Sequence, residues 1–166
     1  MIGDPLGNLW IGTDGGGLNY FDRNTNKFHS YKVNEKQNSI SSNTIKSLWL
    51  DKKRNNLWIG THMGGLNKLN LQTKKFTVFK HNSKNPKSIP DNHVRQITHH
   101  NDTLYIATQN SIGVFDLRTE TCSTMKFEEV DLSKREIPDL FLDSKKRMWF
   151  AFSNKIFMWN IKTHKF

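Results

Sequence analysis

The pentapeptide Leu9-Trp10-Ile11-Gly12-Thr13 returns unchanged as Leu57-Trp58-Ile59-Gly60-Thr61. Related phrases follow at residues 104–108, which read Leu-Tyr-Ile-Ala-Thr, and at residues 148–152, which read Met-Trp-Phe-Ala-Phe. The aromatic positions of the four copies are 44 to 48 residues apart. A period of this size, carried by strand-forming residues and glycine turns, is typical of the blades of a β-propeller.

Three further elements recur in a fixed order around the pentapeptide. One precedes it, at residues 45–51, 94–100 and 137–143, and two follow it, at residues 17–22 and 25–28 in the first copy. They are short, rich in Ile, Leu, Trp, Phe and Thr, and bounded by turn residues, which predicts four strands per blade. No stretch has apolar residues at a sustained helical spacing, so we predict almost no helix.

The repeat predicts an all-β chain that forms a partial β-propeller of about three and a half to four four-stranded antiparallel blades. Residues 1–166 would form a single propeller fragment. The predicted blades are an incomplete first at residues 1–31, complete ones at 40–80 and 89–127, and an incomplete fourth at 136–166. Closed propellers need roughly four to eight blades. We therefore expect partners at the open blade faces, either the rest of a longer parent propeller or another copy of the chain.

Several side chains have a predicted structural place. Trp10, Trp58 and Trp149 recur in register, and we therefore assign them to the core. Ile40 and Ile89 are the large apolar residues near the ends of two polar segments between blades, where we expect them to pack inward as plugs. The single cysteine, at position 122, stands where other copies have phenylalanine, which predicts a small buried apolar residue.

The net charge of +10, from 25 Lys and Arg against 15 Asp and Glu, is compatible with an acidic partner or with a solvated surface. The lysines are spread through turns, which favours the solvated surface. With no recognition helix and no RNA-binding motif, we expect no nucleic-acid partner. There is no apolar run long enough to cross a bilayer and no signal peptide, so we expect this segment to make no membrane contact.

Candidate chemistry is sparse. The seven histidines have no ligand spacing with Cys or Asp, and the adjacent His99 and His100 would face opposite ways in a strand, so we predict no metal site. The glycines after Asp14 precede a strand rather than a helix, which favours a hairpin over a phosphate loop. We find no catalytic constellation, and we predict a non-catalytic fragment without a cofactor.

Residues that break the repeat are the candidates for ligand binding. His62 replaces Asp14 in a hairpin, and His93 and Arg95 replace Thr44 and Lys46 in the loop that enters an inner strand. Both segments belong to one face of a propeller, so a ligand there could meet His62, His93 and Arg95 together. The alternative is plain surface polarity at these three positions.

Residues 7–22 and 56–67, with the preceding strand at 43–51, resemble the two-component-regulator propeller repeat. The resemblance extends over the whole chain and is strongest in the first two copies. It implies the periplasmic sensor region of hybrid two-component histidine kinases of Bacteroides-type bacteria, which commonly act as dimers and respond to oligosaccharides. The oligosaccharide could be anionic. The family motif marks structural positions and transfers no ligand residues.

Two other functions remain open. One is a protein-interaction scaffold that binds a partner through the propeller face or the open ends, without a small ligand. The other is a propeller lyase or hydrolase, which would need catalytic groups converging from several blades.

Overall fold

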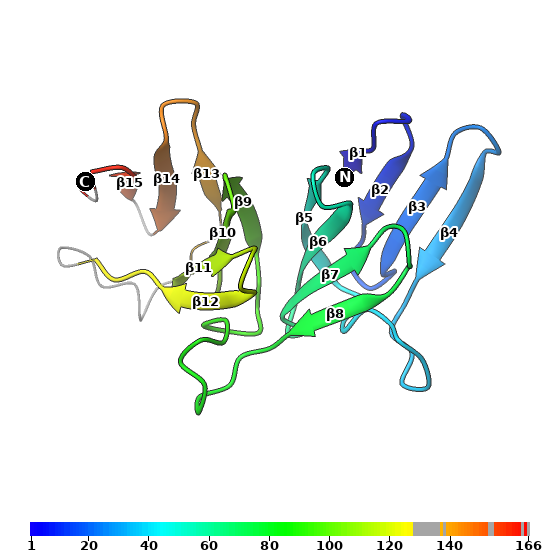
Figure 1. Ribbon diagram of the computed structural model, residues 1–166, viewed down its shortest axis with the longest axis horizontal. Coiled ribbons are helices and arrows are strands. Elements are labelled where there is room, and N and C mark those ends of the chain that lie inside the picture. Colours follow the sequence, from blue (N-terminus) through cyan, green and yellow to red (C-terminus); the bar gives the residue numbers. More distant parts are fainter. Residues whose placement is uncertain (128–136, 138, 153–154, 164, 166) are drawn as a thin grey trace. The chain divides into compact units, whose positions relative to one another are not determined.

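The computed structural model describes residues 1–127, 137, 139–152, 155–163 and 165. These residues form fifteen strands in four antiparallel sheets, and they contain no helix. The chain divides into two compact units, Met1–Lys80 with Asn92–Val94, and His81–Asp91 with Arg95–Phe166. Each unit holds two sheets (Figure 1). The all-β class and the antiparallel blades predicted from the repeat are confirmed, whereas the assignment of all four sheets to a single propeller stays a prediction.

In every sheet the strands are paired in the order of the sequence. The first unit contains β1 (Ile2–Gly3), β2 (Leu9–Gly12), β3 (Leu18–Asp22) and β4 (Lys27–Tyr31), then β5 (Ile45–Asp51), β6 (Asn56–Thr61), β7 (Leu66–Asn70) and β8 (Phe76–Phe79). The second unit contains β9 (Gln96–His100), β10 (Thr103–Ala107), β11 (Ile112–Asp116) and β12 (Thr121–Thr124), then β13 (Leu140–Leu142), β14 (Arg147–Phe152) and β15 (Lys155–Asn160).

The cross-strand register gives each sheet two distinct faces. The face that carries Trp10, or its equivalent in the other copies, is called the tryptophan face. The opposite face, which carries Leu9 or its equivalent, is called the leucine face. Trp10 is paired with Tyr20, and Leu9 is paired with Phe21, so each pair lies on one face of the β1–β4 sheet.

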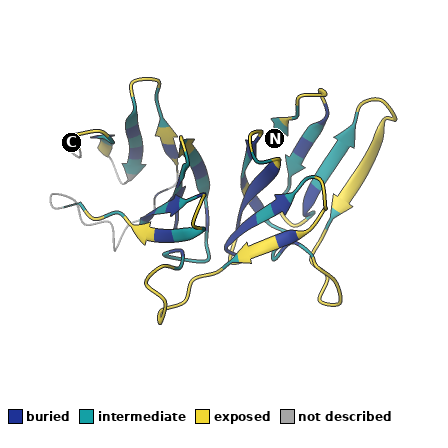
Figure 2. Cartoon of the chain, in the orientation of Figure 1, coloured by how far each residue is buried: buried dark blue, intermediate teal, exposed yellow. Residues whose placement is uncertain are grey.

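Within each unit, the tryptophan face of the earlier sheet packs against the leucine face of the later one. In the first unit, Trp10 and Leu18 share a core cluster with Leu57, Ile59 and Leu69. In the second unit, the residues are Ala107 and Ile112 from the earlier sheet and Leu140, Met148 and Phe150 from the later one. The same contact is therefore built twice. β6 is buried along its whole length, whereas β4 stays largely exposed (Figure 2).

The predicted core position is confirmed for Trp10 and Trp58, which are buried. It is wrong for Trp149, which is half-buried. Trp149 lies on the tryptophan face of the β13–β15 sheet, where its cross-strand partner Phe141 and its face neighbour Ile156 are exposed. The indole is instead held at its polar end, where Nε1 donates to Asp143 Oδ2 at 3.0 Å.

The turns that follow the third strand of each sheet share one hydrogen-bond arrangement. A side-chain oxygen accepts hydrogen bonds from the backbone N–H groups two and three residues later, which shapes the turn. The residues that do so are Asp22, Asn70, Asp116 and Asn160.

The polar segments between blades form loops that are hydrogen-bonded to the sheets. Asn38 forms a two-point contact with the backbone of Phe76, and Ser41 Oγ donates to the Gly64 carbonyl at 2.6 Å. Between these anchors, Ile40 is buried in the core of the first unit, and Ile89 is buried in the corresponding loop of the second unit. The predicted role of both isoleucines as plugs is confirmed.

Cys122 is buried on β12, where its cross-strand partner is Phe115. This agrees with the prediction of a small buried apolar residue at this position. Burial raises the pKa of its thiol to about 12. We expect no measurable reaction with a disulfide reagent at pH 8 while the chain is folded, because almost no thiolate is present. In denaturant, the same titration should give one thiol per chain. Rapid modification of the folded chain would contradict this placement.

Candidate functional site

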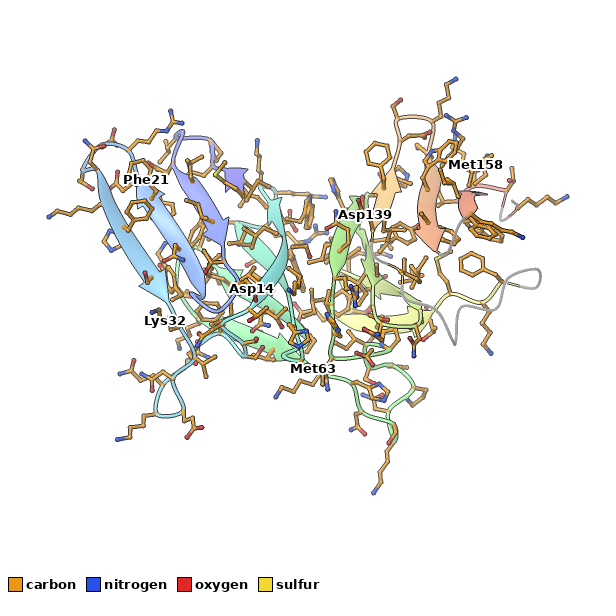
Figure 3. The ribbon with its side chains drawn as sticks, turned by 180° about the vertical axis from the view of Figure 1, so that it is seen from behind. Asp14, Phe21, Lys32, Met63, Asp139 and Met158 are labelled. Carbon is orange, nitrogen blue, oxygen red and sulfur yellow. The ribbon has the colours of Figure 1, made fainter. Side chains whose placement is uncertain are left out.

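The hairpin between β6 and β7 brings two of the predicted residues together. His62 Nδ1 lies 3.1 Å from His93 Nε2, and the two imidazole rings meet edge to face with their centroids 4.4 Å apart. His62 follows β6 directly, and His93 comes from the loop that leads toward β9, so two residues 31 positions apart in sequence build the pair. Both residues belong to the first unit. Met63 labels the tip of this hairpin in Figure 3.

Hydrogen bonds of the residues next to them hold both histidines in place. Thr61 Oγ1 donates to the Gly65 carbonyl at 2.7 Å and closes the hairpin. The loop is tied to the same hairpin on both sides of His93, because Gly65 N donates to the Asn92 carbonyl and Val94 N donates to the Thr61 carbonyl. His93 thus stands between two anchored residues, and the imidazole pair is pre-organised rather than carried on a loose loop.

The first blade has the same scaffold with different chemistry. Thr13 Oγ1 donates to the Gly17 carbonyl at 2.8 Å, and Asn43 accepts from the N–H groups of Gly15 and Gly17. Here Asp14 forms a backbone bridge with Thr44, and its carboxylate lies 3.7 Å from Lys46 Nζ. A shared backbone therefore presents a carboxylate and an ammonium at one hairpin and an imidazole pair at the next.

The third predicted residue, Arg95, belongs to the second unit. Its backbone N–H donates to the Ala107 carbonyl, and its Nη2 donates to Gln109 Oε1 at 3.3 Å. The strand predicted for residues 94–100 begins at Gln96, and Val94 instead donates its N–H to the Thr61 carbonyl at the end of β6. The structure therefore joins His62 to His93 and places Arg95 beside Gln109.

A second candidate site, which the repeat did not predict, is a cavity of about 290 Å³ in the first unit. It lies at the turns rather than at the hairpin with the imidazole pair, and its lining includes Asp4, Trp10, Tyr20, Lys52 and Lys74. This volume is near the lower end for small-molecule pockets, and aromatic walls with a few charged groups at the rim suit a small polar ring.

The Tyr20 hydroxyl orients one wall of this cavity by donating to Asp4 Oδ2 at 3.1 Å. Burial raises the pKa of Tyr20, and the hydrogen bond and negative charge of Asp4 raise it further. Tyr20 therefore stays protonated near neutral pH. The sequence held one usable signal for this site, because Tyr20 breaks the repeat at a position occupied by Lys68, Val114 and Met158 in the other sheets.

No group of three or more His, Cys, Asp or Glu side chains is placed to hold a metal ion in the residues that the structure describes. Over the same residues, no helix has the length and apolar character needed to cross a membrane.

No family model matches the chain, and no curated protein matches it. Among solved structures, it is similar to the extracellular domain assigned to the hybrid two component system BT3049 of B. thetaiotaomicron. The TM-score is 0.78 and the identity 21%, over 96% of this chain and 21% of that chain. A second similar structure is the extracellular domain assigned to the hybrid two component system BT4673 of the same organism, with a TM-score of 0.77 and 20% identity over 99% of this chain and 23% of the other.

A more distant neighbour is Saccharomyces cerevisiae Sqt1, with a TM-score of 0.61 and 14% identity over 91% of this chain and 40% of that chain. At these identities, the likeness shows the fold alone, which is that of antiparallel propeller blades. The chain spans about a fifth of the length of the two B. thetaiotaomicron domains.

Proposed function

We propose that the chain is part of the ligand-sensing region of a hybrid two-component histidine kinase, that it lies in the periplasm, and that it binds its ligand without transforming it. The observation that carries this proposal is the match of nearly the whole chain to extracellular domains of hybrid two-component systems. The phrases at residues 7–22 and 56–67, which resemble the two-component-regulator propeller repeat, support it independently.

The ligand that we propose is an oligosaccharide with acidic groups. The net charge of +10 favours approach of an anion, and an imidazole pair can both donate to and accept from sugar hydroxyl and carboxylate groups. Hairpins on a rigid sheet scaffold are common places for recognition residues, and the pair formed by His62 and His93 is anchored by its neighbours on such a scaffold.

Isothermal titration calorimetry at low ionic strength tests the proposal with neutral and uronate- or sulfate-bearing oligosaccharides of equal length. We expect binding of an acidic series that weakens as salt is added. The double variant His62→Ala/His93→Ala should weaken binding about tenfold or more, a loss of about 1.4 kcal/mol. His29→Ala, a matched change at an exposed histidine of β4, should leave affinity unchanged.

The outcomes distinguish failure of the proposed function from a wrong location of the binding site. Absence of binding to every glycan class would contradict ligand sensing by this chain. Binding that survives the double histidine variant but is lost in Tyr20→Phe would move the site to the cavity beside Asp4. Binding that both sets of variants leave intact would contradict both candidate sites.

A further inference from the structure

Two sheet faces that are buried elsewhere in the chain are exposed in this structure. One is the tryptophan face of the β13–β15 sheet, which carries Phe141, Trp149, Ile156 and Met158. Phe141 is 63% exposed and Ile156 is 76% exposed. A contiguous exposed apolar face of this kind marks an interaction surface. Met158 labels this face in Figure 3.

The equivalent positions in the first unit show what such a face contacts. Ile156 has the register position of Leu18, since each is paired with the small fourth residue of the repeated phrase, and Leu18 is 0% exposed. Trp149 has the position of Trp10, which is 2% exposed. In both comparisons the side chains are of the same kind, aliphatic or tryptophan. The difference is that a second sheet covers the residue of the first unit. The face of β13–β15 is therefore built to be covered by a leucine face.

The second exposed face is the leucine face of the β1–β4 sheet. Leu9, Phe21 and Phe28 form a cross-strand row on it, and the rings of Phe21 and Phe28 lie 4.8 Å apart. Phe28 is 62% exposed, whereas Phe76, at the same position of the next sheet, is 7% exposed. Phe21 labels this face in Figure 3.

We propose that a second copy of this chain covers the exposed face of β13–β15 with the leucine face of its β1–β4 sheet. The contact continues the one that each unit already makes internally, in which a tryptophan face receives a leucine face. One chain carries both halves of the contact. Because the two halves are different surfaces, the association is head to tail and heterologous.

The charges next to the tryptophan face do not oppose docking. Arg147 lies on this face, and its guanidinium carbon is 5.2 Å from the centre of the Trp149 ring. Its Nε also pairs with Asp143 Oδ2 at 2.7 Å. The guanidinium therefore enters the contact already neutralised, so that covering the face leaves no unpaired charge on this pair.

Sedimentation velocity over a concentration series, with light scattering as a second measure of mass, tests the proposal on the full chain. We expect the wild type to associate into dimers or larger species. The tail variant Phe141→Lys/Ile156→Lys and the head variant Phe28→Lys should each raise the dissociation constant about tenfold or more. Met63→Lys, a matched change at an exposed apolar residue of the β6–β7 hairpin, should not change it.

Mixing the two variants tests the head-to-tail geometry itself. Each variant keeps one intact face, so an equimolar mixture should form a dimer of one head variant and one tail variant. Circular dichroism verifies the fold, and Phe141→Ser/Ile156→Ser and Phe28→Ser replace any lysine variant that loses its strand signal. A wild type that stays monomeric throughout the series would overturn the proposal, as would association that both variants leave unchanged or a mixture that does not associate.

Discussion

Replacement of Trp10 with alanine is expected to lower the free energy of unfolding by about 3–5 kcal/mol. The indole is buried in the core between the two sheets of the first unit, where its ring centre lies 4.5 Å from that of Tyr20 and 5.8 Å from that of Tyr31. Its removal leaves a cavity that β-sheet backbones on both sides cannot close. Denaturant unfolding at low protein concentration, where copies of the chain are separate, measures the loss.

Trp10→Phe is the matched control for this change. Trp10 Nε1 is buried and has no hydrogen-bond partner among the described residues, so phenylalanine removes a donor that bonds to nothing while it keeps most of the apolar volume. We therefore expect the phenylalanine variant to lose less than half of what the alanine variant loses. Equal losses would mean that the indole N–H, and not the volume of the ring, stabilises this core.

Ile40→Ala should lower the free energy of unfolding by about 2–5 kcal/mol, although the residue lies in a loop. Ile40 is buried in the core of the first unit, next to Ser41, whose N–H and hydroxyl are held by Asn67 Oδ1 and the Gly64 carbonyl. Loss of the plug would leave this anchored loop over a cavity. The measurement is again denaturant unfolding.

Val33→Ala is the control from the same loop. Val33 is exposed, and a change of its side chain should alter stability by no more than about 0.5 kcal/mol. If Ile40→Ala proved as mild as Val33→Ala, the loop would be shown to collapse around the smaller residue, and Ile40 would not act as a plug.

Most of the strands could be predicted because each is determined by residues within one short segment of the sequence. β5 occupies residues 45–51 as the repeat predicts, since its apolar run and the turn residues that follow it lie in one short segment. The burial of Trp149 could not be predicted in this way. Whether a side chain is covered depends on the sheet that packs over it, and the phrase around Trp149 is the same kind of phrase as the one around Trp10.

The candidate sites also have one part that the sequence predicts and another that depends on how distant segments pack. The meeting of His62 with His93 follows from the repeat, because the hairpin and the loop leading into the next blade lie at the same end of the sheets. The cavity beside Tyr20 requires the turn at Asp4 and the turns at Lys52 and Lys74 to come together, which sequence spacing does not specify. Arg95 is grouped with the histidines because it breaks the repeat in a segment expected at the same propeller face, and its pairing with Gln109 depends on the segment after β10.

The strand order has a consequence for how the chain folds. Each strand of the described sheets pairs only with its neighbours in the sequence, so the hydrogen bonds of a sheet need no residue outside a short stretch of chain. Such local closure has a small entropic cost and favours early formation. During synthesis, one sheet can therefore complete its pairing before the next has left the ribosome. We expect compaction to proceed stepwise from the N-terminus, with the second sheet of each unit covering the sheet made before it.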